Sequence, residues 1–139
     1  PTASTSRQAL EKLHALWEGV GAQVDILDPE RHDRILADIS HLPHLVAYAL
    51  VNMALEGGAV SYAAGGFRDF TRIASSNPEM WREICLDNRE ALLASLDAFV
   101  STLAGLRRAV EEEDSEGMNR AFSSAKEGRD DWLRERGWL

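Results

Sequence analysis

The residues whose types could carry chemistry gather in four short stretches of the sequence. These stretches are His32-Asp33, Ser40–His44, Gly65–Arg72 and Asn77–Trp81. They combine imidazole, guanidinium, carboxylate and glycine backbone, the groups that bind metals, hold anions or donate hydrogen bonds to a substrate. Each of these chemistries has a plainer structural alternative.

His41 and His44 lie three positions apart in the sequence Ser-His-Leu-Pro-His. At a helix start this spacing lets both imidazoles project from one side, where they could bind a metal or hydrogen-bond a substrate. The alternative is a pair of buried, hydrogen-bonded histidines that hold a kinked helix. His32 and Asp33 are candidates for further metal ligands, but no third ligand follows at a recognisable spacing.

Arg68 and Arg72 are four residues apart and therefore share a helix face, and Asp69 could pair with Arg72. The preceding Gly65-Gly66 turn would let backbone amides approach a ligand. Glycine backbone and arginine together could hold a carboxylate or a phosphate. A salt bridge within or between subunits is the alternative.

The elements that must position these groups are almost all helical. Apolar spacing and capping residues predict helices over residues 5–20, 29–40, 42–56, 67–75, 78–112 and 118–134, and a strand over 23–27. The expected caps are Thr5, Asp28 and Asn77, and a proline follows each of the last two. Pro43 is expected to bend or end the second helix. The long helix spaces Leu92, Leu96, Phe99, Leu103, Leu106 and Val110 by four and three residues, which is typical of a helix–helix seam. Trp81 fits an apolar helical stripe, so core packing is its default role.

Composition narrows the class of protein. The 139 residues support one domain, with 45% hydrophobic and 27% charged residues and a net charge of −8. This charge disfavours binding to nucleic acid or to an anionic membrane. One cysteine excludes an internal disulfide and suits the cytoplasm. The lone strand needs a sheet partner, and no initiator Met is present, so we expect a part of a longer protein.

Taken in order, the four stretches resemble the C-terminal helical half of the prephenate/arogenate (cyclohexadienyl) dehydrogenase family. The shared pattern is an HD pair, SHLPH, a glycine-rich segment ending in FRDFTRIA, and a PxxW helix start, found here at His32-Asp33, Ser40–His44, Gly65–Ala74 and Pro78–Trp81. Ala64 stands where many members of the family have a third glycine. The resemblance covers nearly the whole chain and fades over the last helix.

The resemblance implies an all-α dimerisation domain, similar to the C-terminal domain of 6-phosphogluconate dehydrogenase, over residues 29–139. Residues 1–28, with one helix and one strand, would end the nucleotide-binding half. The implied activity is NAD- or NADP-dependent oxidative decarboxylation of prephenate, or arogenate, in tyrosine biosynthesis. An N-terminal Rossmann domain absent from this sequence would bind the cofactor and hold the catalytic residues. The chain alone is therefore expected to be an inactive homodimer.

The resemblance also assigns roles to individual residues. Arg72 would anchor a substrate carboxylate through its bidentate guanidinium. The other implied substrate-binding residues are His44, His41, Gly65, Gly66 and Trp81. Asp69, Arg68 and His32 would support them, and no metal is implied.

Two further interpretations remain from the residues alone. One is a metal-dependent phosphohydrolase of the HD type, with His32, Asp33, His41 and His44 as ligands. The other is a noncatalytic helical module whose seam binds another helix, in which Arg72 would be exposed and dispensable.

Overall fold

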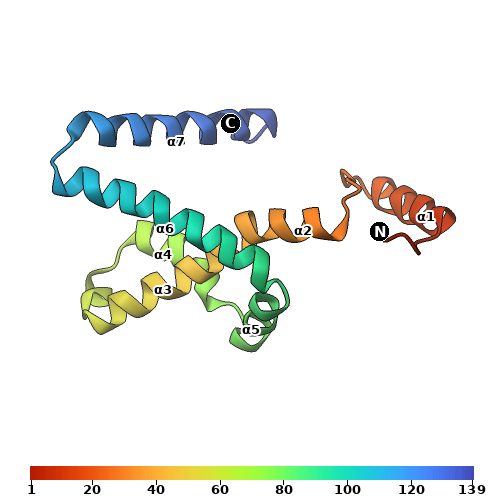
Figure 1. Ribbon diagram of the computed structural model, residues 1–139, viewed down its shortest axis with the longest axis horizontal. Coiled ribbons are helices and arrows are strands. Elements are labelled where there is room, and N and C mark those ends of the chain that lie inside the picture. The colour runs from red at the N-terminus through yellow and green to blue at the C-terminus, as the bar shows by residue number, and fades with distance from the viewer. The chain divides into compact units, whose positions relative to one another are not determined.

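A computed structural model describes all 139 residues, and all of its regular elements are helices, without a strand (Figure 1). The expected all-α fold is confirmed. The elements are α1 (Arg7–Gly19), α2 (Pro29–Leu36), η1 (Ala37–His41), α3 (Leu42–Glu56), η2 (Ala59–Tyr62), α4 (Gly65–Thr71), η3 (Arg72–Ser75), α5 (Pro78–Asp87), α6 (Arg89–Glu111) and α7 (Ser115–Glu135). The chain forms two compact units, Pro1–Leu96 and Asp97–Leu139.

Side-chain caps set where the helices begin. Asp28 accepts a hydrogen bond from the backbone N–H of Arg31 at 2.9 Å, and Asn77 accepts one from that of Glu79 at 2.9 Å. A proline follows each cap at the first helical position, as the sequence predicted. At α1 the prediction was one residue early, because Ser6 rather than Thr5 is the cap.

The strand expected over residues 23–27 does not form in this chain. Residues 22–28 are neither helix nor strand. A strand is defined by hydrogen bonds to a neighbouring strand, and the chain supplies no such neighbour.

Pro43 neither ends the second helix nor separates it from the third. Residues 29–56 are helical without a break, and the widened π-helical turn η1 precedes the proline. In η1 the backbone N–H of Leu42 donates to Ala37 O, five residues back. A π-turn accommodates a proline because it loosens the hydrogen-bond ladder that the ring would otherwise disrupt. His41 is the last residue of this turn.

The single helix expected over residues 78–112 is also wrong, because Asn88 divides it into α5 and α6. Asn88 has φ −102° and ψ 36°, outside the helical region. Its side chain donates to Asp33 O at 2.7 Å, a bond to a distant segment that holds the break in place. Asparagine has a low helix propensity, which makes this position easy to break.

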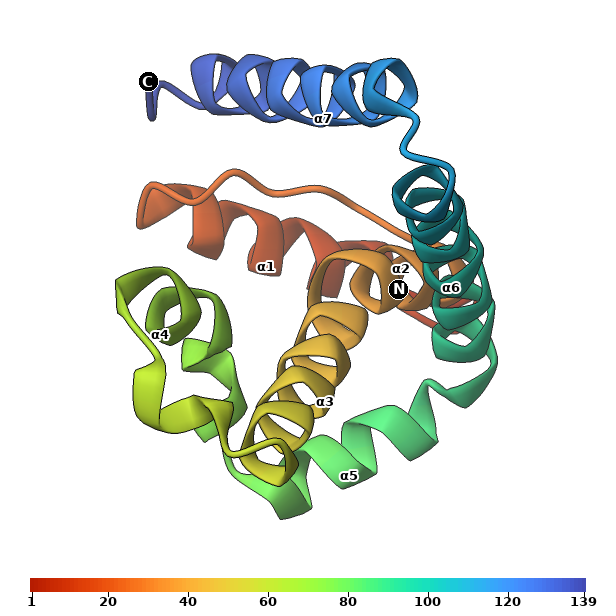
Figure 2. The same cartoon turned by 90° about the vertical axis from the view of Figure 1, so that its left-hand side faces the viewer.

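The core of Pro1–Leu96 is built around α3, which contacts η1, η2, α4 and η3 (Figure 2). Ala37 is 0% and Ala47 1% exposed, so small side chains allow close approach of the helices. Ala54 of α3, Trp81 of α5 and Leu92 of α6 complete the buried apolar set. Ser95 Oγ donates to Asp38 Oδ1 at 2.5 Å and ties α6 to η1.

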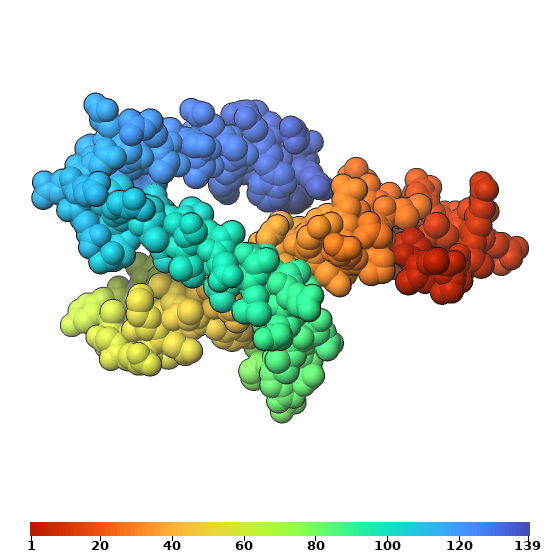
Figure 3. Space-filling view, in the orientation of Figure 1, coloured from red at the N-terminus to blue at the C-terminus, as the bar shows by residue number.

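The unit Asp97–Leu139 contains the rest of α6, a turn and α7. Asp114 caps α7 by accepting from the backbone N–H of Gly117 at 2.8 Å. No residue of this unit is buried. Figure 3 shows the surface of its residues in cyan to blue on one face of the molecule. Leu103 and Val110 of the predicted seam are 51% and 64% exposed, so this part of the seam has no partner within its own unit. None of the helices combines the length and apolar composition that a membrane crossing requires.

Candidate functional site

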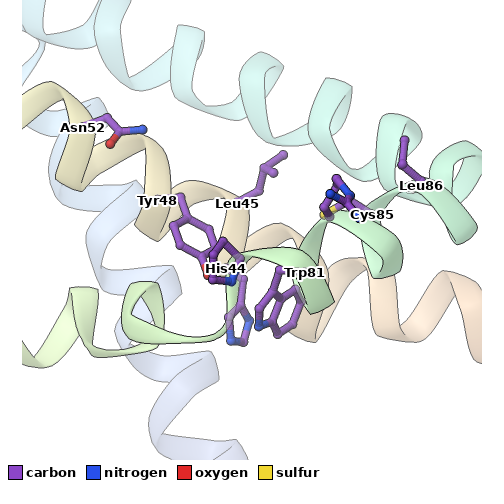
Figure 4. A pocket seen from close by; sticks show the side chains of 9 residues that line it. His44, Leu45, Tyr48, Asn52, Trp81, Cys85 and Leu86 are labelled. Carbon is purple, nitrogen blue, oxygen red and sulfur yellow. The ribbon is translucent and has the colours of Figure 1, made fainter.

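The centre of the site is a stack of His44 on Trp81. The first turn of α3 carries the imidazole and the first turn of α5 carries the indole; their centroids are 3.5 Å apart and their planes differ by 20° (Figure 4). His44 Nδ1 lies 2.9 Å from Ser40 O. Because a carbonyl oxygen only accepts, Nδ1 is the donor. The neutral imidazole of His44 therefore keeps Nε2 as an acceptor.

His41 lies against the same indole in a different geometry. Its ring meets that of Trp81 nearly edge-on, with centroids 6.1 Å apart and planes at 76°. His41 is 8% exposed as a residue, and its Nδ1 lies 3.1 Å from Asn88 Nδ2. Burial lowers the pKa of His41, and the nearby Asp33 carboxylate opposes this shift. The sequence alternative of a buried, hydrogen-bonded histidine is thus correct for His41, while His44 is half-buried.

A cavity of about 380 Å³ opens beside the stack. This volume falls within the range of about 300–1,000 Å³ that small-molecule pockets occupy. The lining comes from one face of α3 and one face of α5: His44, Leu45, Tyr48, Asn52, Pro78, Trp81, Arg82, Cys85 and Leu86. Tyr48 Oη donates to Ser76 O at 2.9 Å, which fixes α3 to the segment before α5.

Sequence reasoning missed most of this lining. Tyr48 and Asn52 follow His44 by four and eight residues, and Arg82 and Cys85 follow Pro78 by four and seven. This spacing marks one helix face and was available in the sequence. The sequence does not show that these two faces oppose each other, because tertiary contacts, the His44–Trp81 stack and the Tyr48–Ser76 bond, join α3 to α5 and the segment before it.

The predicted anion-binding segment lies outside this cavity. Gly65 and Gly66 open α4, no side chain caps that helix, and a Cβ added at either glycine would meet no atom within 4 Å. The expected pair between Asp69 and Arg72 is wrong, because Asp69 bonds the adjacent Arg68 at 3.0 Å. Arg72 is exposed and forms no ion pair within the chain.

The structure brings together only part of the predicted set. The rings of His41 and His44 both lie against Trp81, although only His44 and Trp81 line the cavity. The segment from Gly65 to Arg72 lies apart from them, on α4 and η3. His32 is exposed and its Nδ1 lies 3.0 Å from Asp33 Oδ1. No three His, Cys, Asp or Glu side chains gather in a way that could hold a metal ion, so the phosphohydrolase interpretation lacks its ligand set.

Comparison with known proteins decides the family. A family model described as prephenate dehydrogenase, dimerization domain, matches residues 28–124. The chain belongs to this family. The resemblance inferred from the four stretches is confirmed.

Individual relatives agree with this assignment. Prephenate dehydrogenase of Bacillus subtilis is 41% identical over 99% of this chain and 38% of that protein. The crystal structure of prephenate dehydrogenase from A. aeolicus in complex with hydroxyphenyl propionate and NAD+ superposes with a TM-score of 0.88 at 36% identity, over 94% of this chain and 48% of the other. The crystal structure of Synechocystis arogenate dehydrogenase superposes with a TM-score of 0.83 at 29% identity, over 95% of this chain and 50% of the other. The chain thus spans half or less of these relatives.

Proposed function

We propose that this chain is the dimerisation and substrate-binding part of an enzyme that converts prephenate to 4-hydroxyphenylpyruvate by NAD(P)-linked oxidative decarboxylation in tyrosine biosynthesis. The observation that carries the proposal is the family match over residues 28–124. Relatives named for prephenate and for arogenate both resemble the chain, so arogenate is the substrate to compare. Both are small carboxylates with a ring hydroxyl, and both need an anion site beside a flat apolar wall.

The stacked pair supports the substrate-binding part of this proposal. Trp81 supplies a flat wall, and it is 9% exposed, so its position is fixed by packing. The Nε2 atom of His44 can accept a hydrogen bond from a ring hydroxyl, because Nδ1 already donates to Ser40 O. His41 stands beside them as a second polar group. A ring held against the indole would be oriented by His44 from the cavity lining, with His41, which contacts the same indole but does not line the cavity, as the second proposed imidazole.

Arg72 is the proposed carboxylate anchor. Its guanidinium is exposed and has no ion pair in the chain, so it is available to an anion. Asp69 bonds Arg68, which supports a role for Asp69 in ordering this arginine pair. Gly65 and Gly66 leave open space in which a ligand can approach the backbone. The proposed site extends beyond the cavity, since none of these residues lines it.

The residues of this chain do not fit a dinucleotide. Such cofactors bind at a glycine-rich turn between a strand and a helix, and this chain contains no strand. We therefore place the binding of NAD or NADP outside residues 1–139. In this division, residues 1–28 end the nucleotide-binding half and residues 29–139 form the helical domain. The 139-residue chain alone should not oxidise prephenate.

We also propose that the chain forms a homodimer in the cytoplasm. The family model describes a dimerization domain, and Leu103 and Val110 of α6 are exposed along one seam. A second copy would remove this apolar surface from water. The single free cysteine, Cys85, is compatible with a reducing compartment.

The direct test is an assay of the protein that contains this chain. Purified enzyme is mixed with prephenate or arogenate and with NAD+ or NADP+, and both reduced cofactor and released CO2 are measured. We expect equal amounts of the two products with at least one substrate. Reduced cofactor without CO2, or no turnover of either substrate, would contradict the proposal.

A further inference from the structure

Asn88 is the residue at which α5 and α6 separate, and its side chain reaches back to two groups. Asn88 Nδ2 lies 2.7 Å from Asp33 O and 3.1 Å from His41 Nδ1. One amide nitrogen therefore connects the α5–α6 junction to α2 and to the last residue of η1. Its two hydrogens are enough for both contacts.

These contacts determine where the proton of His41 lies. The carbonyl oxygen of Asp33 can only accept, so the atom of Asn88 that faces it must be the NH2 nitrogen and not the amide oxygen. The same nitrogen faces His41 Nδ1, so this ring nitrogen must accept. The neutral imidazole of His41 consequently carries its proton on Nε2.

His44 is held in the opposite state by a different partner. Its Nδ1 faces Ser40 O at 2.9 Å and must donate, which leaves Nε2 without a proton in the neutral ring. Both rings contact Trp81. Trp81 Nε1 is the only fully buried side-chain polar atom without a partner, so neither histidine Nε2 is a fully buried orphan. His44 lines the cavity and His41 does not.

We propose that Asn88 is a positioning residue that holds His41 as the Nε2–H tautomer, so that the two histidines beside Trp81 present one donor and one acceptor to a ligand. A ligand oxygen without a proton matches His41, and a hydroxyl matches His44. Only the identity of that ligand rests on the proposed function. The tautomers follow from the hydrogen bonds alone.

The surroundings of His41 favour the neutral ring that this arrangement needs. Asp33 on α2 is the charged group that favours protonation, and it is bonded to His32 at 3.0 Å. His32 and His44 act in the opposite direction. The α5–α6 side contributes Trp81 and Asn88, neither of which is charged. An imidazolium at His41 would also place an N–H against the NH2 of Asn88.

The first experiment measures the tautomers directly in the full-length protein that contains this chain. Two-bond 1H–15N correlation spectra of 15N-histidine-labelled protein distinguish Nδ1–H from Nε2–H, and His41→Gln and His44→Gln assign the signals. We expect the Nε2–H form for His41 and the Nδ1–H form for His44. A proton on Nδ1 of His41 would overturn the proposal, whether or not the enzyme turns over prephenate.

The second experiment reverses the polarity of Asn88. In Asn88→Asp the carboxylate can only accept, so His41 should become the Nδ1–H tautomer and its titration should move up by about one pH unit or more. Ser95→Ala is the matched control, because it removes the α6 bond to Asp38 without touching His41. It should leave the His41 spectrum unchanged. An unchanged His41 in Asn88→Asp would overturn the proposal.

Kinetics then separate positioning from a purely structural role. Losing the Nε2 donor should raise the KM of Asn88→Asp for prephenate about five- to tenfold at pH 8, with a smaller change in kcat. KM should recover at lower pH, because an imidazolium has a proton on Nε2 again. If Asn88 had only a structural role, the change in KM would be independent of pH, and Ser95→Ala would show the same change. Absence of any turnover would contradict the proposed function but not the tautomers.

Discussion

The imidazole of His44 lies flat on the indole of Trp81, with ring centroids 3.5 Å apart. This contact joins α3 to α5 and forms one wall of the cavity. It depends on η1, which directly precedes the first turn of α3, and on Asn77, which starts α5. The stack is therefore both part of the core and part of the candidate site.

Trp81→Ala should reduce the free energy of unfolding by about 3–5 kcal/mol, because it removes a buried indole and leaves a cavity. Trp81→Phe should cost clearly less, since a phenyl ring still stacks and the unpartnered Nε1–H disappears. Urea unfolding measures both. Trp138→Ala is the control: the residue is 64% exposed, and we expect a loss of no more than about 1 kcal/mol. Equal losses at positions 81 and 138 would contradict this account.

Arg72→Ala should weaken substrate binding by about 2–4 kcal/mol, because a charge-assisted contact to a carboxylate is lost. This corresponds to roughly 30- to 1,000-fold in apparent affinity for prephenate. Arg72→Lys should restore little, since an ammonium keeps the charge but loses the bidentate geometry. The KM for the nicotinamide cofactor should stay nearly constant.

The control for Arg72 is Arg129→Ala, which removes another exposed arginine that has no ion pair in the chain. Steady-state kinetics and melting curves are recorded on all variants. A normal KM for prephenate together with a lowered Tm in Arg72→Ala would instead support a structural salt bridge between subunits.

The sequence predicted the helices well because their start signals are local. Asp28-Pro29 and Asn77-Pro78 cap their helices as expected, and the apolar spacing identified α3. The break at Asn88 could not be predicted in this way, because its cause is a hydrogen bond to Asp33, fifty-five residues earlier. The strand over 23–27 failed for a related reason, since strand formation depends on a partner segment.

The residues of the candidate site also divide into those that could be identified from the sequence and those whose role depends on tertiary contacts. His41 and His44 were identified from their types and spacing and Trp81 from the family resemblance, and the structure places both imidazoles against the indole. Tyr48 and Asn52 were missed because their side chains carry no distinctive motif. Their role in the cavity depends on how α3 faces α5, which only tertiary contacts establish.

The exposed end of the α6 seam leads to a prediction about assembly. Leu103→Glu should convert the dimer to monomers at micromolar concentration, because it places a charge in an apolar interface. Light scattering measures the change in mass. Ser101→Glu, on the same helix but off the seam, should leave the dimer intact. A wild-type protein that is monomeric under these conditions would refute the seam as a dimer contact.

The stability of the fold should depend on pH through His41. Burial lowers its pKa below the usual value of 6.5, so the folded protein binds the proton less readily than the unfolded chain. As the pH falls from about 7.5 through 6.5, the unfolded state gains a proton that the folded state resists, and stability decreases. The decrease should end once the pH is below the pKa of the folded protein. Urea midpoints between about pH 7.5 and 5 measure this slope, and His41→Gln should flatten it. A slope that persists unchanged in His41→Gln would show that another group is responsible.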